Sequence, residues 1–361
     1  MTGRRLRWEK IKISDEAYES AGVFDVNNDG VLDIVSGAYW YEGPSWKKHK
    51  ICDVRAEGEY YDDFSTIPMD VNGDGYMDFI TGGWWGCELY WRENPKGQPV
   101  EWNTHKIDAC GNVETTRAWD VDGDGILEIC PNTPGAPLVF YKLVDGGFKK
   151  YTVTETPIGH GLGFGDVVNS GKGCFITNSG YWEPTGDPLS DPWEFHKEFQ
   201  LYPAASVPIL AVDLNNDGKN EIIVGNAHGY GLDYYTRGCG SGGSRVWTRH
   251  PIDPWFSQYH DMIWVDIDGD GQGELITGSR HRAHCGNDPG EDDFVGLYIF
   301  KWNGESFTKQ VVDFGTVPYH SGTGIFFCVA DIDGDGRLDI VAPGKEGLYI
   351  FRNRGFESIG A

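Results

Sequence analysis

Short runs of hydrophobic residues alternate with acidic, glycine-rich loops along the whole chain. One loop pattern recurs seven times, as in DVNNDGVLDIV, DVDGDGILEIC and DIDGDGRLDIV, with DVVNSGKGCFI as a degenerate copy. The copies begin at Asp25, Asp70, Asp120, Asp166, Asp213, Asp266 and Asp331. Neighbouring copies therefore start between 45 and 65 residues apart. Self-similarity at this period is typical of propellers and solenoids.

Each copy predicts four β-strands. An apolar, β-rich run precedes the first aspartate and another follows the loop, so the loop is the tip of a hairpin. A third run follows, such as LYWREN, and a fourth carries an aromatic marker, such as WKKHKI from Trp46. Four strands in each of seven units predict an all-β fold, a seven-bladed β-propeller, as a single domain over residues 1–361.

The two ends of the chain supply complementary parts of one blade. After the seventh loop the chain ends with a third strand, GLYIFRNRG, and lacks a fourth. The N-terminal segment WEKIKI from Trp8 matches WKKHKI, with Ile11 at the histidine position. We therefore expect the N-terminal strand to complete the last blade and to leave the ring without exposed edges.

Composition and charge narrow the classes of function. The formal net charge of −25 argues against nucleic acid as a partner, because phosphate binding needs clustered Lys and Arg. No apolar run approaches the length that spans a bilayer, and the N-terminus has no apolar secretory core, so no membrane partner is expected. The eight cysteines form no CxxC pair, which predicts reduced thiols and a cytoplasmic location. The oligomeric state stays open.

The acidic loops have the spacing of a calcium site. Six copies place acids or amides at positions 1, 3, 5 and 9 with glycine at 6, which resembles the first half of an EF-hand loop. We expect structural Ca²⁺ there; the alternative is that the aspartates only cap backbone amides. The fourth copy has Val168, Ser170 and Cys174 instead, and should bind no metal. The predicted ligands are Asp25, Asn27, Asp29, Asp33, Asp70, Asn72, Asp74, Asp78, Asp120, Asp122, Asp124, Glu128, Asp213, Asn215, Asp217, Glu221, Asp266, Asp268, Asp270, Glu274, Asp331, Asp333, Asp335 and Asp339.

These loops resemble the FG-GAP or VCBS repeats of β-propellers, and the likeness covers nearly the whole chain. The resemblance implies the fold but says little about function, because such propellers serve as adhesins, lectins and enzymes.

The repeat also assigns each histidine to a face of the disc. The aspartate loops mark one face, and the connections between strands 2 and 3, and between blades, emerge on the other. Four of the ten histidines fill a structural W-x-x-H slot in the fourth strand: His49, His105, His196 and His250. The remaining six all fall in segments of the second face: His160, His228, His260, His281, His284 and His320.

Other polar and aromatic residues gather on that second face. They include Tyr60, Tyr61, Trp84, Glu114, Arg117, Tyr230, Arg280, Arg282, Asp288 and Lys345. Polar groups converging among aromatics are typical of a sugar-binding cleft, in which arginine grips a carboxylate, so we expect a small saccharide or sugar acid as partner. Glu114, Arg117 and Lys345 also fit a salt-bridge network at the surface.

Several histidines near one axis offer two kinds of chemistry. Neutral imidazoles can bind a catalytic divalent metal such as Zn²⁺ or Mn²⁺, or they can act as acid and base beside a tyrosine. Histidine, tyrosine and arginine together suit β-elimination by a carbohydrate lyase or dehydratase: a base removes a proton, a cation steadies the enolate and an acid protonates the leaving oxygen. The alternatives are a glycoside hydrolase on the same face and a non-catalytic carbohydrate-binding propeller.

A finer resemblance supports the lyase interpretation. The segments YYDDFSTIPMDVNGDG, GHGLGFGDV, AHGYG, WFSQYHDM and RHRAHCGNDPGE are similar to those of VCBS propellers that act on sugars. These include the propeller domain of the aldos-2-ulose dehydratases and the rhamnosyl-glucuronate lyases. The resemblance implies a central site, elimination on a sugar or uronic acid, and a bound divalent metal. The matching positions are His160, His228, Tyr230, His260, Arg280, His284 and Asp288.

We accordingly predict two sets of site residues on the histidine face. Catalytic roles are expected for His160, His228, Tyr230, His260, Arg280, His284, His320 and Tyr61. Substrate contacts are expected for Tyr60, Arg117, Arg282, Asp288, Lys345 and Trp84. Within the long segment GSRHRAHCGNDPGEDD, Asp288 is expected to orient a neighbour, and His281 to be a bystander.

Overall fold

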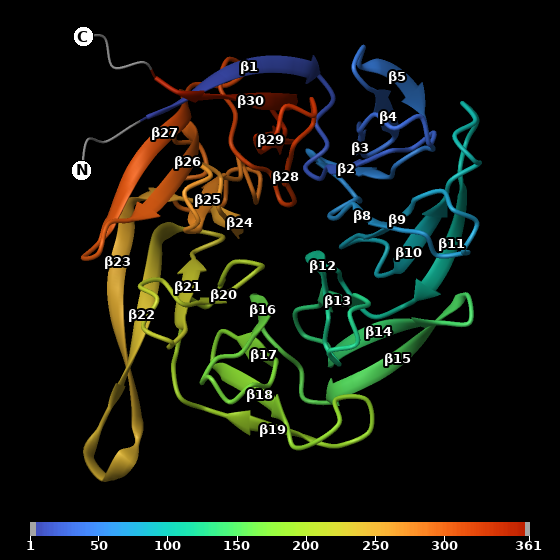
Figure 1. The fold of residues 1–361 in the computed structure, drawn as a ribbon. Helices are drawn as coiled ribbons and strands as arrows, with labels where there is room; N and C mark the ends of the chain where they lie inside the picture. Colours follow the sequence, from blue (N-terminus) through green and yellow to red (C-terminus); the bar gives the residue numbers. More distant parts are fainter. Residues whose placement is uncertain (1–4, 358–361) are drawn as a thin grey trace.

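Seven four-stranded antiparallel sheets form a closed ring in the computed structural model, which describes residues 5–357 (Figure 1). The predicted all-β, seven-bladed propeller is confirmed. We number the blades by their aspartate loops, so blade one holds the loop of Asp25 and blade seven the loop of Asp331. In each blade the strand that precedes the loop lies nearest the centre of the ring (Figure 1).

Blades one to four follow the chain in simple order. Blade one consists of β2 (Gly22–Phe24), β3 (Asp33–Ser36), β4 (Tyr39–Glu42) and β5 (Lys47–Lys50), and blade two of β8 (Ile67–Met69), β9 (Asp78–Gly82), β10 (Leu89–Glu93) and β11 (Asn103–Asp108). Blade three consists of β12 (Thr115–Trp119), β13 (Glu128–Asn132), β14 (Leu138–Val144) and β15 (Gly147–Thr154). Blade four consists of β16 (Leu162–Gly165), β17 (Cys174–Thr177), β18 (Gly180–Pro184) and β19 (Trp193–His196).

Blades five and six continue this order, and blade seven takes its outer strand from the N-terminus. Blade five consists of β20 (Leu210–Val212), β21 (Glu221–Gly225), β22 (Tyr230–Cys239) and β23 (Arg245–Ser257). Blade six consists of β24 (Tyr259–Val265), β25 (Glu274–Ser279), β26 (Val295–Trp302) and β27 (Phe307–Gly315). Blade seven consists of β28 (Cys328–Ala330), β29 (Asp339–Ala342), β30 (Leu348–Phe356) and β1 (Leu6–Ser14).

The N-terminal strand closes the ring as predicted. β1 pairs antiparallel with β30, with Glu9 opposite Arg352 and Ile11 opposite Ile350. Figure 1 shows the two strands side by side, one from each end of the chain. Each outer strand therefore has a partner, and the chain itself locks the first and last segments together.

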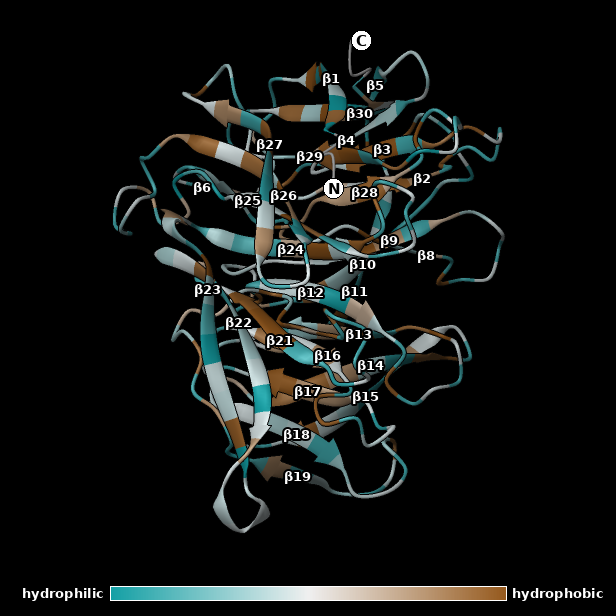
Figure 2. Ribbon diagram, turned by 60° about the vertical axis from the view of Figure 1, so that its left-hand side comes forward, coloured by the Kyte–Doolittle hydropathy of each residue, from teal (hydrophilic) through white to brown (hydrophobic). Residues whose placement is uncertain are grey.

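The core lies between neighbouring blades. The second strands are almost wholly buried, and β17 and β21 are among the most apolar segments in Figure 2. Ile176 of blade four and Ile222 of blade five belong to one buried cluster, which shows how the blade faces pack. The eight cysteines are all free thiols. Among residues 5–357 no helix has the length and apolar character needed to cross a bilayer.

The aspartate loops are tight turns held by their own carboxylates. In blade one, Asp25 accepts hydrogen bonds from the amides of Asp29 (3.1 Å) and Gly30 (2.8 Å). The ninth-position Asp33 accepts the amide of Val26 at 2.8 Å. Gly30 has a φ of 86°, a left-handed conformation that explains glycine at position six. The amide-capping alternative for these aspartates is therefore present in the structure.

A small hairpin between blades one and two lies outside the blade sheets. Its strands are β6 (Ala56–Glu57) and β7 (Tyr60–Tyr61). The Tyr60 hydroxyl donates a hydrogen bond to the carbonyl of Ala283 at 2.8 Å. This contact joins the hairpin to the long connection between β25 and β26, and so brings two distant parts of the chain together beside the centre of the ring.

Candidate metal and ligand site

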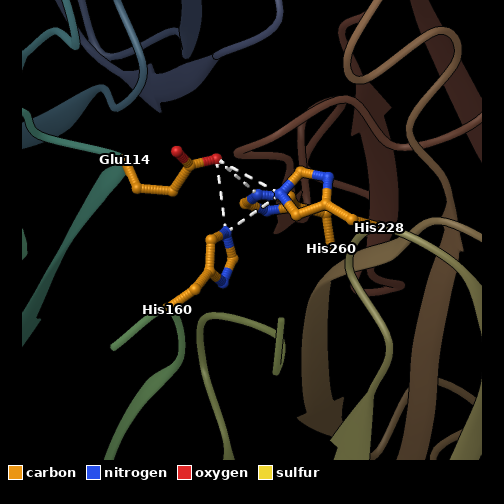
Figure 3. Close-up of side chains that lie close together, drawn as sticks. All are labelled: Glu114, His160, His228 and His260. Atoms are coloured by element: carbon orange, nitrogen blue, oxygen red, sulfur yellow. Dashed lines mark hydrogen bonds and ion pairs between the residues drawn. The ribbon is translucent and has the colours of Figure 1, made fainter. Parts of the chain in front are cut away.

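Four side chains meet at the centre of the face opposite the aspartate loops (Figure 3). Glu114 lies directly before β12, His160 before β16, His228 between β21 and β22, and His260 within β24. Blades three to six therefore each contribute to the cluster. Gly161, with a φ of 104°, follows His160, and a Cβ there would lie 2.5 Å from that of Ala205. Glycine is needed for this close approach.

One carboxylate oxygen and three imidazole nitrogens converge in this cluster. Glu114 Oε1 lies 2.9 Å from His260 Nε2, 3.4 Å from His160 Nε2 and 3.9 Å from His228 Nε2. The Nε2 atoms of His160 and His228 are 3.1 Å apart. All four donor atoms lie within 4.8 Å of one another. Three imidazoles and a carboxylate are a donor set that suits Zn²⁺ or Mn²⁺.

The outer ring nitrogens fix the tautomers of two histidines. His160 Nδ1 lies 2.7 Å from the Ala205 carbonyl oxygen, which can only accept a hydrogen bond, so Nδ1 carries the proton. His228 Nδ1 lies 2.9 Å from a carboxylate oxygen of Asp288 and likewise donates. In the neutral rings both Nε2 atoms then present lone pairs toward the same point. Such outer hydrogen bonds are typical of histidines that bind metals.

Burial favours the neutral form of two imidazoles in the cluster, those of His228 and His260. It lowers the pKa of His228 to about 4 and that of His260 well below its usual value. Burial alone would raise the pKa of Glu114, but hydrogen bonds from His160 and His260 hold it well below its usual value. The cluster therefore combines an ionised carboxylate with the neutral rings of His228 and His260, and a bound cation would compensate its charge.

Asp288 links the cluster to a further histidine. Its two carboxylate oxygens accept hydrogen bonds from His228 Nδ1 and His284 Nδ1, both at 2.9 Å. The rings of His228 and His284 stack with their centroids 3.9 Å apart and an interplanar angle of 12°. Among the described residues no hydrogen bond engages His284 Nε2. This half-exposed imidazole is thus oriented by a carboxylate and retains a free nitrogen.

A buried chain of alternating charges supports the other side of Glu114. Arg280, 2% exposed, has its Nη1 3.3 Å from Glu114 Oε1 and its Nε 2.9 Å from Glu19 Oε1. Lys345 Nζ lies 3.1 Å from the same Glu19 oxygen. Each buried charge thus has an opposite partner. Glu19 was not predicted, because it precedes the first repeat and has no counterpart in the pattern.

A cavity of about 160 Å³ opens beside this cluster. Its lining combines aromatic rings with charged groups: Tyr60, Phe64, Trp84, Trp85, Glu114, Arg280, Ala283 and His284. The Trp85 ring lies 4.8 Å from that of Tyr60 and 5.9 Å from that of Phe64, which makes one wall of the cavity aromatic. A ligand in the cavity would contact these rings and also Glu114, Arg280 and His284.

Some predicted site residues line a different cavity. Tyr61, Arg282, Lys345 and His281 border a space of about 560 Å³, together with Glu346. Arg282 is held in ion pairs with acidic residues of the surrounding loops. These residues therefore lie on the histidine face without joining the four-residue cluster.

Three more predicted residues lie apart from the cluster. The Tyr230 hydroxyl donates to Asp293 at 2.7 Å, and His320 Nδ1 lies 2.7 Å from Asp313 Oδ1. Arg117 is buried, forms an ion pair of 2.5 Å with Asp261 and does not line the cavity beside Glu114.

The sequence predicted the face on which the site residues lie, but not which of them are in contact. The common face of the histidines was readable from their place in the repeat. Glu114 was placed on the correct face but not among the candidate ligands, because one glutamate in a connection has no distinguishing context. Its adjacency to His160, His228 and His260 follows only from the closure of the ring.

Comparisons with known proteins support the repeat pattern. Residues 70–130 and 213–277 match the model of a family described as FG-GAP-like repeat. The chain carries FG-GAP-like repeats. The two matched stretches span the aspartate loops of blades two, three, five and six, and they include Glu114, His228 and His260 of the cluster. No curated protein matches the chain.

Solved structures resemble this FG-GAP-like propeller in fold alone. The crystal structure of BBS1N in complex with ARL6DN, soaked with mercury, is 12% identical, has a TM-score of 0.53 and covers 96% of each chain. The lead-soaked form of the complex is also 12% identical, with a TM-score of 0.50 and 95% of each chain covered. The V. cholerae biofilm matrix protein Bap1 is 15% identical with a TM-score of 0.35, over 90% of this chain and 45% of that one.

Proposed function

We propose that the protein is a metal-dependent carbohydrate lyase or dehydratase that performs β-elimination on a sugar or a uronic acid. The observation that carries the proposal is the convergence of Glu114 Oε1 with three Nε2 atoms next to an aromatic cavity. Two of those nitrogens, in His160 and His228, lie 3.1 Å apart, and each ring donates its other nitrogen to an outer acceptor. When both rings are neutral, a bound cation would accept the lone pairs of both Nε2 atoms.

The ligands of this metal would be Glu114, His160, His228 and His260. A divalent ion there would act as a Lewis acid toward an oxygen of the substrate. The aromatic wall formed by Trp85 and its neighbours would stack on the apolar face of a sugar ring and orient it toward the ligands.

His284 is the proposed base. Asp288 holds its Nδ1–H, which leaves Nε2 to accept a proton, and the His284 side chain lines the cavity. His284 takes the proton alpha to the carbonyl or carboxylate, and the electron pair of that C–H bond becomes the carbon–carbon double bond. The bond to the leaving oxygen breaks, and His284 returns the proton to that oxygen. Arg280 lies beside Glu114 and supplies positive charge near the enolate.

A glycoside hydrolase is less well supported by the same cavity. Hydrolysis by the usual mechanisms needs two carboxyl groups on opposite sides of the scissile bond. Glu114 is the one carboxylate among the residues that line the cavity, and the histidines already surround it. The set of groups therefore favours elimination.

The proposal is tested with a panel of uronides and keto-sugars, by the ultraviolet absorbance of the conjugated double bond. We expect an absorbing product from the wild type and a loss of roughly 10²–10⁴-fold in rate for His284→Gln, the usual contribution of general acid–base catalysis. The His284→Gln protein should keep its bound metal.

His281→Gln is the matched control, because His281 belongs to the same loop but lines the other cavity. It should leave the rate unchanged. The absence of an unsaturated product across the panel, or full activity of His284→Gln, would contradict the proposed elimination.

A further inference from the structure

The repeat resemblance implies Ca²⁺ in the aspartate loops, and the blades differ at the position that decides whether it fits. In each blade one residue of the third strand lies opposite the ninth position of the loop. In blade six Lys301 pairs with Glu274. The same register in the other blades gives Glu42, Glu93, Lys142, Glu183, Thr236 and Arg352, in blades one, two, three, four, five and seven.

A lysine ammonium group lies among the acids in blades three and six. Lys142 Nζ is 2.7 Å from Asp122 Oδ2, 2.8 Å from Asp124 Oδ2 and 2.7 Å from Glu128 Oε1. These acids hold loop positions 3, 5 and 9, the positions expected to bind Ca²⁺. The Lys142 side chain is 12% exposed. Its ammonium group therefore already uses the oxygens that the ion would need.

Blade six repeats this arrangement. Lys301 Nζ is 2.5 Å from Asp268 Oδ2, 2.7 Å from Asp270 Oδ2 and 2.7 Å from Glu274 Oε1. Two blades far apart in the sequence thus make the same three contacts from the same register position. Ca²⁺ requires six to eight oxygen ligands at roughly 2.3–2.6 Å. A cation of the same sign already bound to three of them does not leave room for it.

The fourth strand changes together with the third. In blades one and two the third-strand residue is an acid that pairs with the W-x-x-H histidine, as in Glu42 with His49 and Glu93 with His105, both at 2.8 Å. In blade five Thr236 Oγ1 lies 2.9 Å from His250 Nε2.

The blades that carry a cation lack this histidine. Their fourth strands have Tyr151, Gln310 and Ile11 in its place. The blades therefore fall into two classes, which differ in both the third and the fourth strand.

Arginines approach the loop of blade seven. Arg354 Nη1 lies 3.3 Å from Asp333 Oδ2 and 3.9 Å from Asp335 Oδ2, and Arg352 Nε lies 3.6 Å from the same Asp333 oxygen. The exposed lysines of blades two and five reach only one loop acid each: Lys96 to Asp74 at 3.6 Å and Lys219 to Asp217 at 3.7 Å. Those two lie at the rim of their loops.

We propose that Lys142 and Lys301, and the arginines in blade seven, are permanent internal cations that replace Ca²⁺, so that these three loops fold without a metal ion. Ca²⁺ is then restricted to blades one, two and five. This inference concerns the scaffold and is independent of the chemistry at the histidine cluster.

The test is Ca²⁺ binding and Ca²⁺-dependent thermal unfolding of the full chain. By equilibrium dialysis, the wild type should bind no more than three Ca²⁺ per chain. Lys142→Met leaves the acids of blade three uncompensated, so we expect its Tm in EDTA to fall by about 2–4 °C or more. Ca²⁺ should restore that Tm and bind at one additional site, because an ion that binds only the folded state stabilises it.

Lys219→Met is the control, since Lys219 also touches an aspartate loop but at its exposed rim. It should gain no Ca²⁺. Four or more Ca²⁺ bound to the wild type, or a folded Lys142→Met variant that binds no additional Ca²⁺, would overturn the proposal. If Lys142→Met does not fold, Lys301→Met and the wild-type stoichiometry decide the question.

Discussion

His160 and His228 face each other with their Nε2 atoms 3.1 Å apart, although each ring already donates its other nitrogen to an acceptor. When both rings are neutral, these two Nε2 atoms present lone pairs to one another. The carboxylate of Glu114 adds a third electron-rich group at the same point. The arrangement is electrostatically costly when empty and favourable around a cation, and this is why the metal proposal rests on these two residues.

The first prediction concerns metal content. The purified protein should retain a divalent transition metal at the cluster, and His160→Ala should lose it, because one of its four ligands is then missing. Elemental analysis after dialysis measures the effect. His320→Ala serves as the control, since His320 pairs with Asp313 outside the cluster and should keep the metal. Equal metal content in the two variants would contradict the assignment.

The second prediction concerns Asp288. Asp288→Asn removes the charge that orients His228, so we expect a fall of roughly 10–100-fold in metal affinity, as is usual when such outer partners are lost. Competition with a chelator of known affinity measures it. Asp293→Asn, in the same loop, is the control, because within residues 5–357 the Asp293 side chain accepts a hydrogen bond from Tyr230 alone. A metal affinity unchanged in Asp288→Asn would rule out this positioning role.

The fold could be predicted from the sequence because the same pattern of strands and loops occurs seven times. Alignment of the copies predicted the strand order and the position of the loops. It also predicted that the N-terminal strand around Trp8 becomes the outer strand of the last blade. Ile11 occupies the histidine position of the W-x-x-H motif in blade seven, so the sequence already marked this blade as one without the outer histidine.

The candidate site was only partly predictable. Its residues come from connections, where the repeat specifies the face but not the distance between side chains. His160, His228 and His260 meet because the ring closes, whereas His320, on the same face, lies beside Asp313. Glu19 lies outside the repeat pattern, so its ion pair with Arg280 is visible only in the structure.

The third prediction concerns ring closure. Removing residues 1–14 deletes β1 and leaves β30 as an unpaired edge strand, and it exposes apolar surface that Leu6 now covers. We expect a lower Tm and concentration-dependent association, because exposed edges pair with other chains. Thermal unfolding and light scattering measure both effects. Deleting residues 1–4 alone should change neither, and a truncation of residues 1–14 with unchanged Tm would contradict the closure argument.

The last prediction concerns pH and the buried Glu346. Burial raises the pKa of this carboxyl to about 7, while the backbone amide of Gly322 and the hydroxyl of Ser321 donate hydrogen bonds to it. Between about pH 4.5 and 7 the folded state therefore holds a proton that the unfolded state, with a pKa of 4.5, has released. The stability contributed by this group is fully present below about pH 4.5 and falls as pH rises toward 7, by about 3 kcal/mol in total.

Glu346→Gln should remove this dependence, because the amide does not ionise. The free energy of unfolding, measured by denaturant titration between pH 5 and pH 8, should then decline less steeply in the variant than in the wild type. At pH 8 the variant should be at least as stable as the wild type, since it avoids a buried, ionised carboxylate. The exposed Glu305 provides the control, because Glu305→Gln should keep the wild-type slope. Parallel pH profiles for Glu346→Gln and the wild type would show that Glu346 is ionised without cost and that a partner compensates its charge.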